Sequence, residues 1–303
     1  MQRPPVLGTR ASPLALAQAR MVAAALEAAQ GWDSGSVQIK PVKTSGDRIQ
    51  DRPLAEVGGK ALWTKELDQY LLTCETDLSV HSMKDVESSR PDALRIAAML
   101  PRADVRDRLV GAPSIEALSQ GATVGTSSPR RTAQLLRLRP DLQVASIRGN
   151  VATRLAKVAA GKFDATFLAA AGLDRLGIKE GIAVESNVML PAPAQAAIGA
   201  ECRSDDDVMR SLLEAINHQP TCAAVHVERA FARAVGGSCH SPVAALAVLG
   251  ADGQLWLRAE LLSTDGLECV AGEVRFKFGD AAPEQLAQDL LSRAPPSVRT
   301  LFA

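Results

Sequence analysis

Three segments of this chain repeat one pattern, in which a short apolar run leads through polar residues to the start of a helix. The apolar runs lie at residues 6–7, 122–125 and 144–147, and the helix starts lie at Ser12, Ser128 and Asn150. Serine and asparagine side chains accept hydrogen bonds from the free N–H groups at a helix start. Proline follows the serine in the first two segments, and at the first helical position its missing N–H costs no hydrogen bond. Strands that alternate with helices form sheets covered by helices. The repeated pattern therefore predicts an α/β fold.

The pattern also predicts where individual elements end. The first helix is expected to run from Pro13 to about Gln30 and to stop at Gly31, because glycine accepts the left-handed conformation that closes many helices. A strand is expected near residues 37–42. The continuous apolar run at residues 163–171 predicts a strand that is buried on both faces.

The last third of the chain reads differently. Pro191 and Pro193 interrupt it before a helical pattern that begins at Ala194, which indicates a crossing between domains. The pattern of the residues after this crossing predicts a small α+β unit. Its expected elements are a helix over residues 225–234, strands over 244–249, 254–262 and 268–278, and a helix over 283–291.

The charges balance, with 34 Lys+Arg against 34 Asp+Glu, so no overall field attracts nucleic acid or an anionic membrane. Any anion site must be local. No apolar run approaches the roughly 20 residues that span a bilayer, and the first five residues lack the apolar core of a secretory signal, so we expect a cytoplasmic protein. The 5 cysteines and 4 histidines show no metal-ligand spacing, which predicts free thiols and no zinc.

The run from His81 to Asp85 places an imidazole, a hydroxyl, an ammonium and a carboxylate after an expected strand. Residues 77–80 alternate polar and apolar, as in a half-buried strand. Ligands bind at the carboxyl ends of parallel strands, so Asp85 is a candidate for proton transfer or for stabilising a cation. Taken alone, the run is equally compatible with a solvated surface loop.

Arginines accompany two of the repeated helix starts. Arg130 and Arg131 follow Ser128, and Arg148 and Arg154 surround Asn150. Free N–H groups beside guanidinium groups form an anion site for carboxylate or phosphate. Together with Arg10 and Arg175 these residues favour a functional cluster, whereas Arg137 and Arg139 alone are typical of a solvated helix face.

Two further segments are candidates for function. Residues 44–60 form a polar, charged stretch that is expected to be a long mobile loop, and Lys60 follows its glycine pair. Cys239 lies among glycine, serine and proline, so its thiol is expected on an exposed turn, as a nucleophile or an attachment point. A hydrolase pair with the adjacent His240 is disfavoured, because neighbouring residues rarely aim at each other. The other four cysteines are expected to pack.

Motifs spread over the whole chain resemble, in order, those of the porphobilinogen deaminase (hydroxymethylbilane synthase) family. The residues that carry the resemblance are Arg10-Ala11-Ser12-Pro13-Leu14-Ala15, Gly58-Gly59-Lys60, Lys65-Glu66-Leu67, His81-Ser82-Met83-Lys84-Asp85-Val86, Gly125-Thr126-Ser127-Ser128 with Arg130-Arg131, Arg148-Gly149-Asn150-Val151 with Thr153-Arg154, and the Cys239 turn.

The resemblance implies a reaction. The family condenses four porphobilinogen units head to tail, with loss of ammonia, on a dipyrromethane cofactor that a cysteine holds through a thioether. By resemblance, Cys239 carries the cofactor and Asp85 is catalytic. The implied cofactor-binding residues also include Lys84, Ser82, Thr126, Ser127, Ser128, Arg130, Arg131 and Arg148, and the implied substrate-binding residues are Arg10, Ser12, Arg154, Arg175, Lys60 and Gln195.

The resemblance also implies three domains, two of them similar to type 2 periplasmic-binding-protein domains. Domain 1 would comprise residues 1–100 and 195–220, domain 2 residues 101–194, and a small α+β domain 3 residues 221–303. The chain departs from the family pattern at Ser238, Ala194 and Ala196, where glycines are usual, and at Trp63, where phenylalanine is usual. Ala103 and Val105 replace an acidic residue and a proline. The departures put in doubt the backbone geometry at the cysteine turn and around Gln195.

The implied partner is the small-molecule substrate porphobilinogen, and neither nucleic acid nor a membrane is expected as a partner. The protein is expected to be a monomer. The main alternative is a binding protein of the same two-domain architecture that holds a small carboxylate without turnover, because a fold alone does not settle function. Such a binder has no need of Asp85 or of an exposed Cys239.

Overall fold

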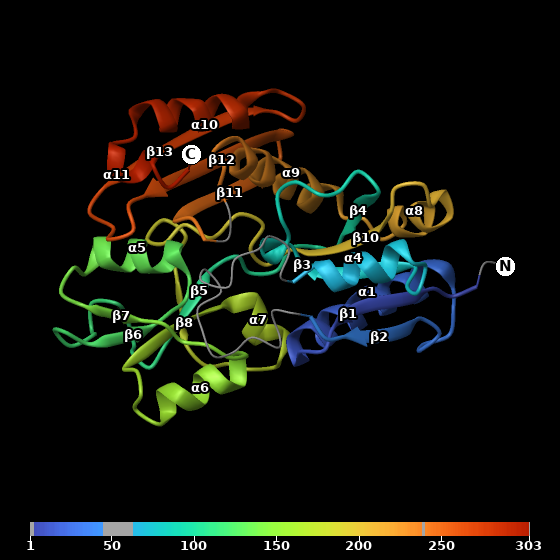
Figure 1. Cartoon of the computed structure of the whole chain (residues 1–303), viewed down its shortest axis with the longest axis horizontal. Helices are drawn as coiled ribbons and strands as arrows, with labels where there is room; N and C mark the ends of the chain where they lie inside the picture. The colour runs from blue at the N-terminus through green and yellow to red at the C-terminus, as the bar shows by residue number, and fades with distance from the viewer. Residues whose placement is uncertain (1–2, 45–62, 238–239, 303) are drawn as a thin grey trace. The chain divides into compact units, whose positions relative to one another are not determined.

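The computed structural model describes residues 3–44, 63–237 and 240–302. The expectations for the 44–60 loop, for Lys60 and for the turn with Ser238 and Cys239 therefore lie outside the described residues, apart from Thr44. The chain divides into two compact units (Figure 1). Unit 1 contains residues 1–103 and 196–222, and unit 2 contains residues 104–195 and 223–303.

Unit 1 is built on one five-stranded sheet of order β2-β1-β3-β10-β4. Strand β1 pairs in parallel with β2 and β3, whereas β10 runs antiparallel to β3 and β4. The strands are β1 (Val6–Arg10), β2 (Gln38–Val42), β3 (Leu78–Ser82), β4 (Leu94–Met99) and β10 (Ile198–Arg203), and the helices are α1 (Pro13–Gln30), α4 (Lys65–Leu72), the 3₁₀ turn η1 (Met83–Asp85) and α8 (Asp207–Glu214).

Helix α1 has the predicted ends. The Ser12 hydroxyl accepts a hydrogen bond from the Ala15 N–H at 3.3 Å, and Pro13 occupies the first turn. Gly31 closes the helix at φ 66°, in the left-handed region that favours glycine. Residues of α1 such as Val22 and Leu26 are fully buried in the core that covers the sheet. The helix therefore fixes the loop that carries Arg10 and Ser12 at the carboxyl end of β1.

The first segment of unit 2, residues 104–195, forms a second five-stranded sheet of order β7-β6-β8-β5-β9. Strand β6 is parallel to β7 and β8, and β5 is antiparallel to β8 and β9. The elements are β5 (Asp107–Val110), β6 (Thr123–Gly125), α5 (Pro129–Leu138), β7 (Gln143–Ala145), α6 (Val151–Ala159), β8 (Ala165–Ala169), α7 (Ala170–Arg175) and β9 (Ile182–Val184).

The remainder of the chain is the predicted small α+β region. An antiparallel sheet of order β11-β12-β13 packs one face on helices α9 and α10, since alternate residues of β12 share a core with Phe231 and Leu290. The elements are α9 (Gln219–Ala234), β11 (Val243–Leu249), β12 (Gln254–Leu262), β13 (Cys269–Lys277), α10 (Ala282–Arg293) and α11 (Pro296–Arg299). The fold class is therefore the predicted one, α/β with a small α+β C-terminal domain.

Three local predictions were wrong. Strand β3 is buried at Leu78, Ser79, Val80 and His81, not half-buried, because α1 and α4 both pack against it. The strand expected over residues 163–171 stops at Ala169, where α7 begins. The expected helix from Ala194 is instead a turn that leads into β10, because a short apolar run has the same composition in a buried strand as in a helix.

The turn around Gln195 has a strained backbone. Ala194 has φ 62° and Ala196 has φ 71°, so both alanines occupy the left-handed region. The doubt raised by these two departures from glycine is thereby answered, since the chain keeps the backbone conformation that glycine favours and places alanines in it.

Among the described helices, none is long and apolar enough to cross a membrane.

Candidate functional site

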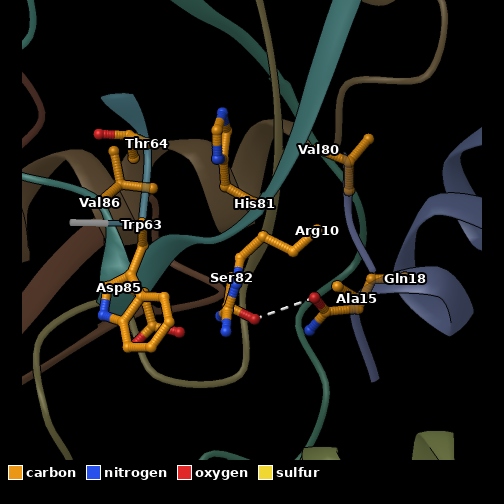
Figure 2. Close-up of a pocket in the computed structure, with 10 residues that line it drawn as sticks. All are labelled: Arg10, Ala15, Gln18, Trp63, Thr64, Val80, His81, Ser82, Asp85 and Val86. Carbon is orange, nitrogen blue, oxygen red and sulfur yellow. Dashed lines mark hydrogen bonds between the residues drawn. The ribbon is translucent and has the colours of Figure 1, made fainter. Parts of the chain in front are cut away.

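A pocket opens at the carboxyl edge of the unit 1 sheet. Arg10 ends β1, Ser82 ends β3, and Asp85 ends the 3₁₀ turn that follows β3. Because β1 and β3 are parallel, their carboxyl ends meet at one edge, and all three residues line the pocket (Figure 2). The other residues that line it are Ala15, Gln18, Trp63, Thr64, Val80, His81 and Val86. The structure thus brings together Arg10, Ser82 and Asp85, three of the site residues that the resemblance implies.

The turn that carries Asp85 is anchored by Met83. The Met83 N–H donates to the Ala197 carbonyl at 3.1 Å, and its side chain is 1% exposed. A Cβ on Gly199 of β10 would stand 2.1 Å from the Met83 sulfur, so only glycine leaves room for this side chain. Gly199 therefore lets the turn sit on the sheet and fixes the start of the segment that presents Asp85.

The other pocket residues orient one another. Ser82 donates its hydroxyl hydrogen to Gln18 Oε1 at 2.9 Å, which connects β3 to α1. The Arg10 guanidinium lies over the Trp63 ring, 3.9 Å from its centroid, a cation–π contact. A cation and a carboxylate, Arg10 and Asp85, therefore line one pocket. That combination suits a ligand that carries carboxylates and passes through a cationic state.

Behind this pocket lies a buried ionic cluster that the sequence reasoning missed. We call it the Arg90 cluster, and it comprises Thr64, Asp68, His81, Glu87, Arg90 and Glu201. Burial alone would raise the pKa of Glu201, but the hydrogen bonds and charges of His81 and Arg90 outweigh it and lower that pKa to about 2. Burial raises the pKa of Asp68 despite the opposing charge of Arg90. A glutamate in the middle of the apolar β10 run was the signal that could have revealed the cluster.

The two helix starts of unit 2 have the predicted caps. The Ser128 hydroxyl accepts from the Arg131 N–H at 3.5 Å, and Asn150 Oδ1 accepts from the Thr153 N–H at 2.9 Å. Ser127 donates to the Ile147 carbonyl at 2.8 Å and lies 2.9 Å from the Ser146 hydroxyl, so it joins the ends of β6 and β7.

Other predicted residues lie around these helix starts. The Thr126 hydroxyl accepts from the Ser128 N–H at 3.2 Å. Arg154 Nε donates to the Gly149 carbonyl at 2.9 Å. Arg148 is partly exposed, and its carbonyl accepts from Lys157 Nζ at 3.0 Å. Arg175 ends α7, and burial lowers its pKa to about 10 although Asp174 raises it. Lys84 lies within η1 in unit 1.

The structure gives Arg130 and Arg131 a carboxylate of the protein as partner, in place of the open anion site expected at this helix start. The two residues are 3% and 6% exposed. Arg130 Nη2 binds Asp107 Oδ2 at 2.7 Å, and Arg131 binds both Asp107 oxygens, at 3.1 and 2.7 Å. Although burial disfavours a charged carboxylate, the two guanidinium groups lower the pKa of Asp107. Gln195 joins the same cluster, since its Nε2 donates to Asp107 Oδ1 at 2.8 Å.

Asp107 was also missed by the sequence reasoning. It is 1% exposed and starts β5, where an inward-facing acid between Arg106 and Arg108 was the available signal.

Within the residues described, no three His, Cys, Asp or Glu side chains gather as a metal site.

The chain is similar to known proteins over nearly its whole length. A family model described as porphobilinogen deaminase, dipyromethane cofactor binding domain, matches residues 6–211, and one described as porphobilinogen deaminase, C-terminal domain, matches residues 222–294. The chain is 55% identical to a porphobilinogen deaminase of Sphingopyxis alaskensis, over 98% of this chain and 96% of that protein. It is 48% identical to one of Paracoccus denitrificans, over 97% and 96%. Among solved structures, the periplasmic VFT2 domain of Bordetella pertussis BvgS matches with a TM-score of 0.39 and 17% identity, over 70% of this chain and 86% of that one.

Proposed function

Because this chain belongs to the porphobilinogen deaminase family, we propose that it joins four porphobilinogen molecules head to tail into hydroxymethylbilane and releases one ammonia for each. The observation that carries the proposal is the pocket in which Asp85 and Arg10 lie together. A binding protein without turnover is not favoured, since the matched family model is named for cofactor binding in a deaminase.

Asp85 would act on the substrate in each cycle. The bond between the aminomethyl carbon and nitrogen breaks, the electron pair leaves with the nitrogen as ammonia, and a cationic azafulvene remains. Asp85 gives its proton to the leaving amine, and the carboxylate that remains stabilises the cation. When the new carbon–carbon bond forms, the ring proton that it displaces returns to the carboxylate. Asp85 is therefore unchanged at the end of each cycle.

The dipyrromethane cofactor supplies the covalently held pyrrole end on which the product grows, and Cys239 would hold it by a thioether. The residues present fit such a group, because its acetates and propionates need cations and the described chain sets arginines at the carboxyl edges of both five-stranded sheets. We assign cofactor binding to Ser82, Lys84, Thr126, Ser127, Ser128, Arg130, Arg131 and Arg148. Substrate binding is assigned to Arg10, Ser12, Lys60, Arg154, Arg175 and Gln195.

For Arg130 and Arg131 this assignment requires a cofactor carboxylate to share or replace Asp107, because that residue occupies both guanidinium groups. Gln195 would act through the same cluster. We further propose that the enzyme works as a cytoplasmic monomer with domain 1 at residues 1–100 and 195–220, domain 2 at 101–194 and domain 3 at 221–303.

Asp85→Asn tests the central assignment, because it keeps the shape of the side chain and removes its charge. We expect ammonia release to fall on the order of a hundredfold or more, as when a main charge-stabilising group is removed. Intact mass should show that the variant still carries the dipyrromethane. Near-normal turnover by such loaded protein would contradict the role of Asp85.

Cys239→Ala tests the attachment site separately. This variant should have the mass of the bare chain and little activity, whereas Cys74→Ala should keep both the extra mass and the turnover. Finding the added mass on another cysteine would overturn the assignment, and a bare parent chain with no turnover would favour the binding protein.

A further inference from the structure

Arg90 lies in the segment between Asp85 and β4, and its side chain is 8% exposed. Its Nε and Nη2 bind the two oxygens of Glu201 at 2.8 and 2.9 Å. Its Nη1 binds Glu87 Oε2 at 2.8 Å and Thr64 Oγ1 at 3.3 Å, and its Nη2 also binds Asp68. One guanidinium group therefore connects the start of α4, the internal strand β10 and the segment that follows η1.

These contacts reach the lining of the Asp85 pocket at separate points. Thr64 lines the pocket and follows Trp63, whose ring covers Arg10. His81 also lines it, and its Nε2 lies 3.1 Å from Glu201 Oε2. Glu87 follows the lining residue Val86, and Thr64 donates its hydroxyl hydrogen to Glu87 Oε2 at 3.1 Å.

We propose that Arg90 is a positioning residue of the Asp85 pocket, which holds Thr64 and Glu87 together and orients His81 through Glu201. Trp63 and Asp85 are each one or two residues from a group that Arg90 binds. Arg90 therefore sets the separation between the wall that carries Trp63 and the turn that carries Asp85. This inference rests on the proposed role of Asp85 in the reaction.

The chemistry of the cluster explains why arginine occupies this position. Three carboxylates, from Asp68, Glu87 and Glu201, surround a single guanidinium group. Arginine has five N–H donors in a fixed fork and can bind all of them together with a hydroxyl, whereas lysine is a point charge with three donors. Without Arg90 the three carboxylates would repel one another and Glu201 would stay buried with only His81.

The test compares Arg90→Met with Arg203→Met. Arg203 is a matched control in the same unit, because it also braces α4, donating to the carbonyls of Leu71 and Thr76 at 2.9 and 3.0 Å, but at the end of the helix away from Thr64. Each variant is prepared with its dipyrromethane, and kcat and KM for porphobilinogen are measured at a temperature where all proteins are folded. In a second series each protein also carries Trp32→Phe and Trp256→Phe, so that fluorescence reports Trp63 alone.

We expect Arg90→Met to lower kcat/KM on the order of tenfold to a hundredfold, the scale of a misplaced catalytic geometry, and to shift the Trp63 emission. Arg203→Met should lower the denaturation midpoint and leave kcat/KM and the emission near those of the parent. Arg90→Lys should give a kcat/KM and a Trp63 emission between those of Arg90→Met and the parent, since lysine keeps the positive charge but lacks the forked donors of arginine. Thr64→Val, which removes one contact and no charge, should shift the emission even if Arg90→Met does not fold.

The proposal fails if folded Arg90→Met, or Thr64→Val in its place, keeps the kcat/KM and the Trp63 emission of the parent. It also fails if Arg203→Met changes both as much, because the effect would then be a general loss of stability. The emission does not depend on turnover. A normal rate in Asp85→Asn would therefore refute the proposed role of Asp85 while leaving a clear result on the placement of Trp63.

Discussion

The carboxyl edges of the two five-stranded sheets use buried ion pairs in different ways. In unit 1 the Arg90 cluster lies behind the pocket, and Arg10 and Asp85 line the pocket itself. In unit 2 the predicted binding residues Arg130 and Arg131 are themselves the buried cations. A buried charge is tolerated only when partners compensate it. The comparison teaches that an arginine at a helix start can be committed to the fold before any ligand arrives.

The largest expected effect comes from breaking the unit 2 cluster. Asp107→Asn keeps the size of the side chain but leaves two buried guanidinium groups without their carboxylate. We expect the free energy of unfolding to fall by about 3–5 kcal/mol, as for other buried pairs that lose one partner. Chemical denaturation measures this directly. Asp141→Asn is the control, because its pair with Arg139 is partly exposed and should contribute less than about 1 kcal/mol.

The same variant sharpens the comparison between the sheets. If a cofactor carboxylate takes the place of Asp107, the dipyrromethane should restore part of the lost stability in Asp107→Asn. Loaded and bare protein would then differ more in this variant than in the parent. An equal difference would indicate that Arg130 and Arg131 serve the fold alone.

A smaller effect is expected from pH in unit 1. Ionised Glu201 stabilises the fold because its pKa is lowered from 4.5 to about 2. This stabilisation is complete above about pH 4.5 and disappears as the pH falls toward 2, and it amounts to about 3 kcal/mol. Glu201→Gln should flatten the unfolding free energy over that interval, whereas Glu273→Gln on exposed β13 should leave the slope unchanged. An unchanged slope in Glu201→Gln would show that its charge is not coupled to folding.

The sequence predicted what depends on local chemistry. The caps at Ser12, Ser128 and Asn150 and the stop at Gly31 follow from the residues beside them, and all four were confirmed. The place of Asp85 at the carboxyl end of a strand followed from the rule for parallel strands, whereas Arg10 and Ser82 were assigned to the same site by resemblance. The partners of Arg90 and Arg130 could not be predicted, because they join residues up to 111 positions apart whose pairing the tertiary fold decides.

The burial of β3 and the strand β10, where a helix was expected, were missed for a related reason. Periodicity reports which face of an isolated element is apolar, and it does not report how many layers cover the element. Ser79 is fully buried although its neighbours suggested an exposed face. The apolar run after Ala197 became a central strand because β3 and β4 both pair with it.

The smallest expected effect concerns the turn that leads into β10. A left-handed alanine is strained by about 1–2 kcal/mol, which glycine avoids. Ala194→Gly relieves that strain but removes a buried methyl group, so it should be less destabilising than Ala197→Gly by about 1 kcal/mol. Ala197 is the matched control, since it is 1% exposed, like Ala194, and lacks a positive φ. Denaturation curves of both variants decide the matter, and an equal loss of stability would mean that the turn stores no strain.

If the difference is found and Ala196→Gly behaves like Ala194→Gly, the Gln195 turn holds its shape against its own backbone preference. The contact of Gln195 with Asp107 would then be one of the interactions that offset the strain.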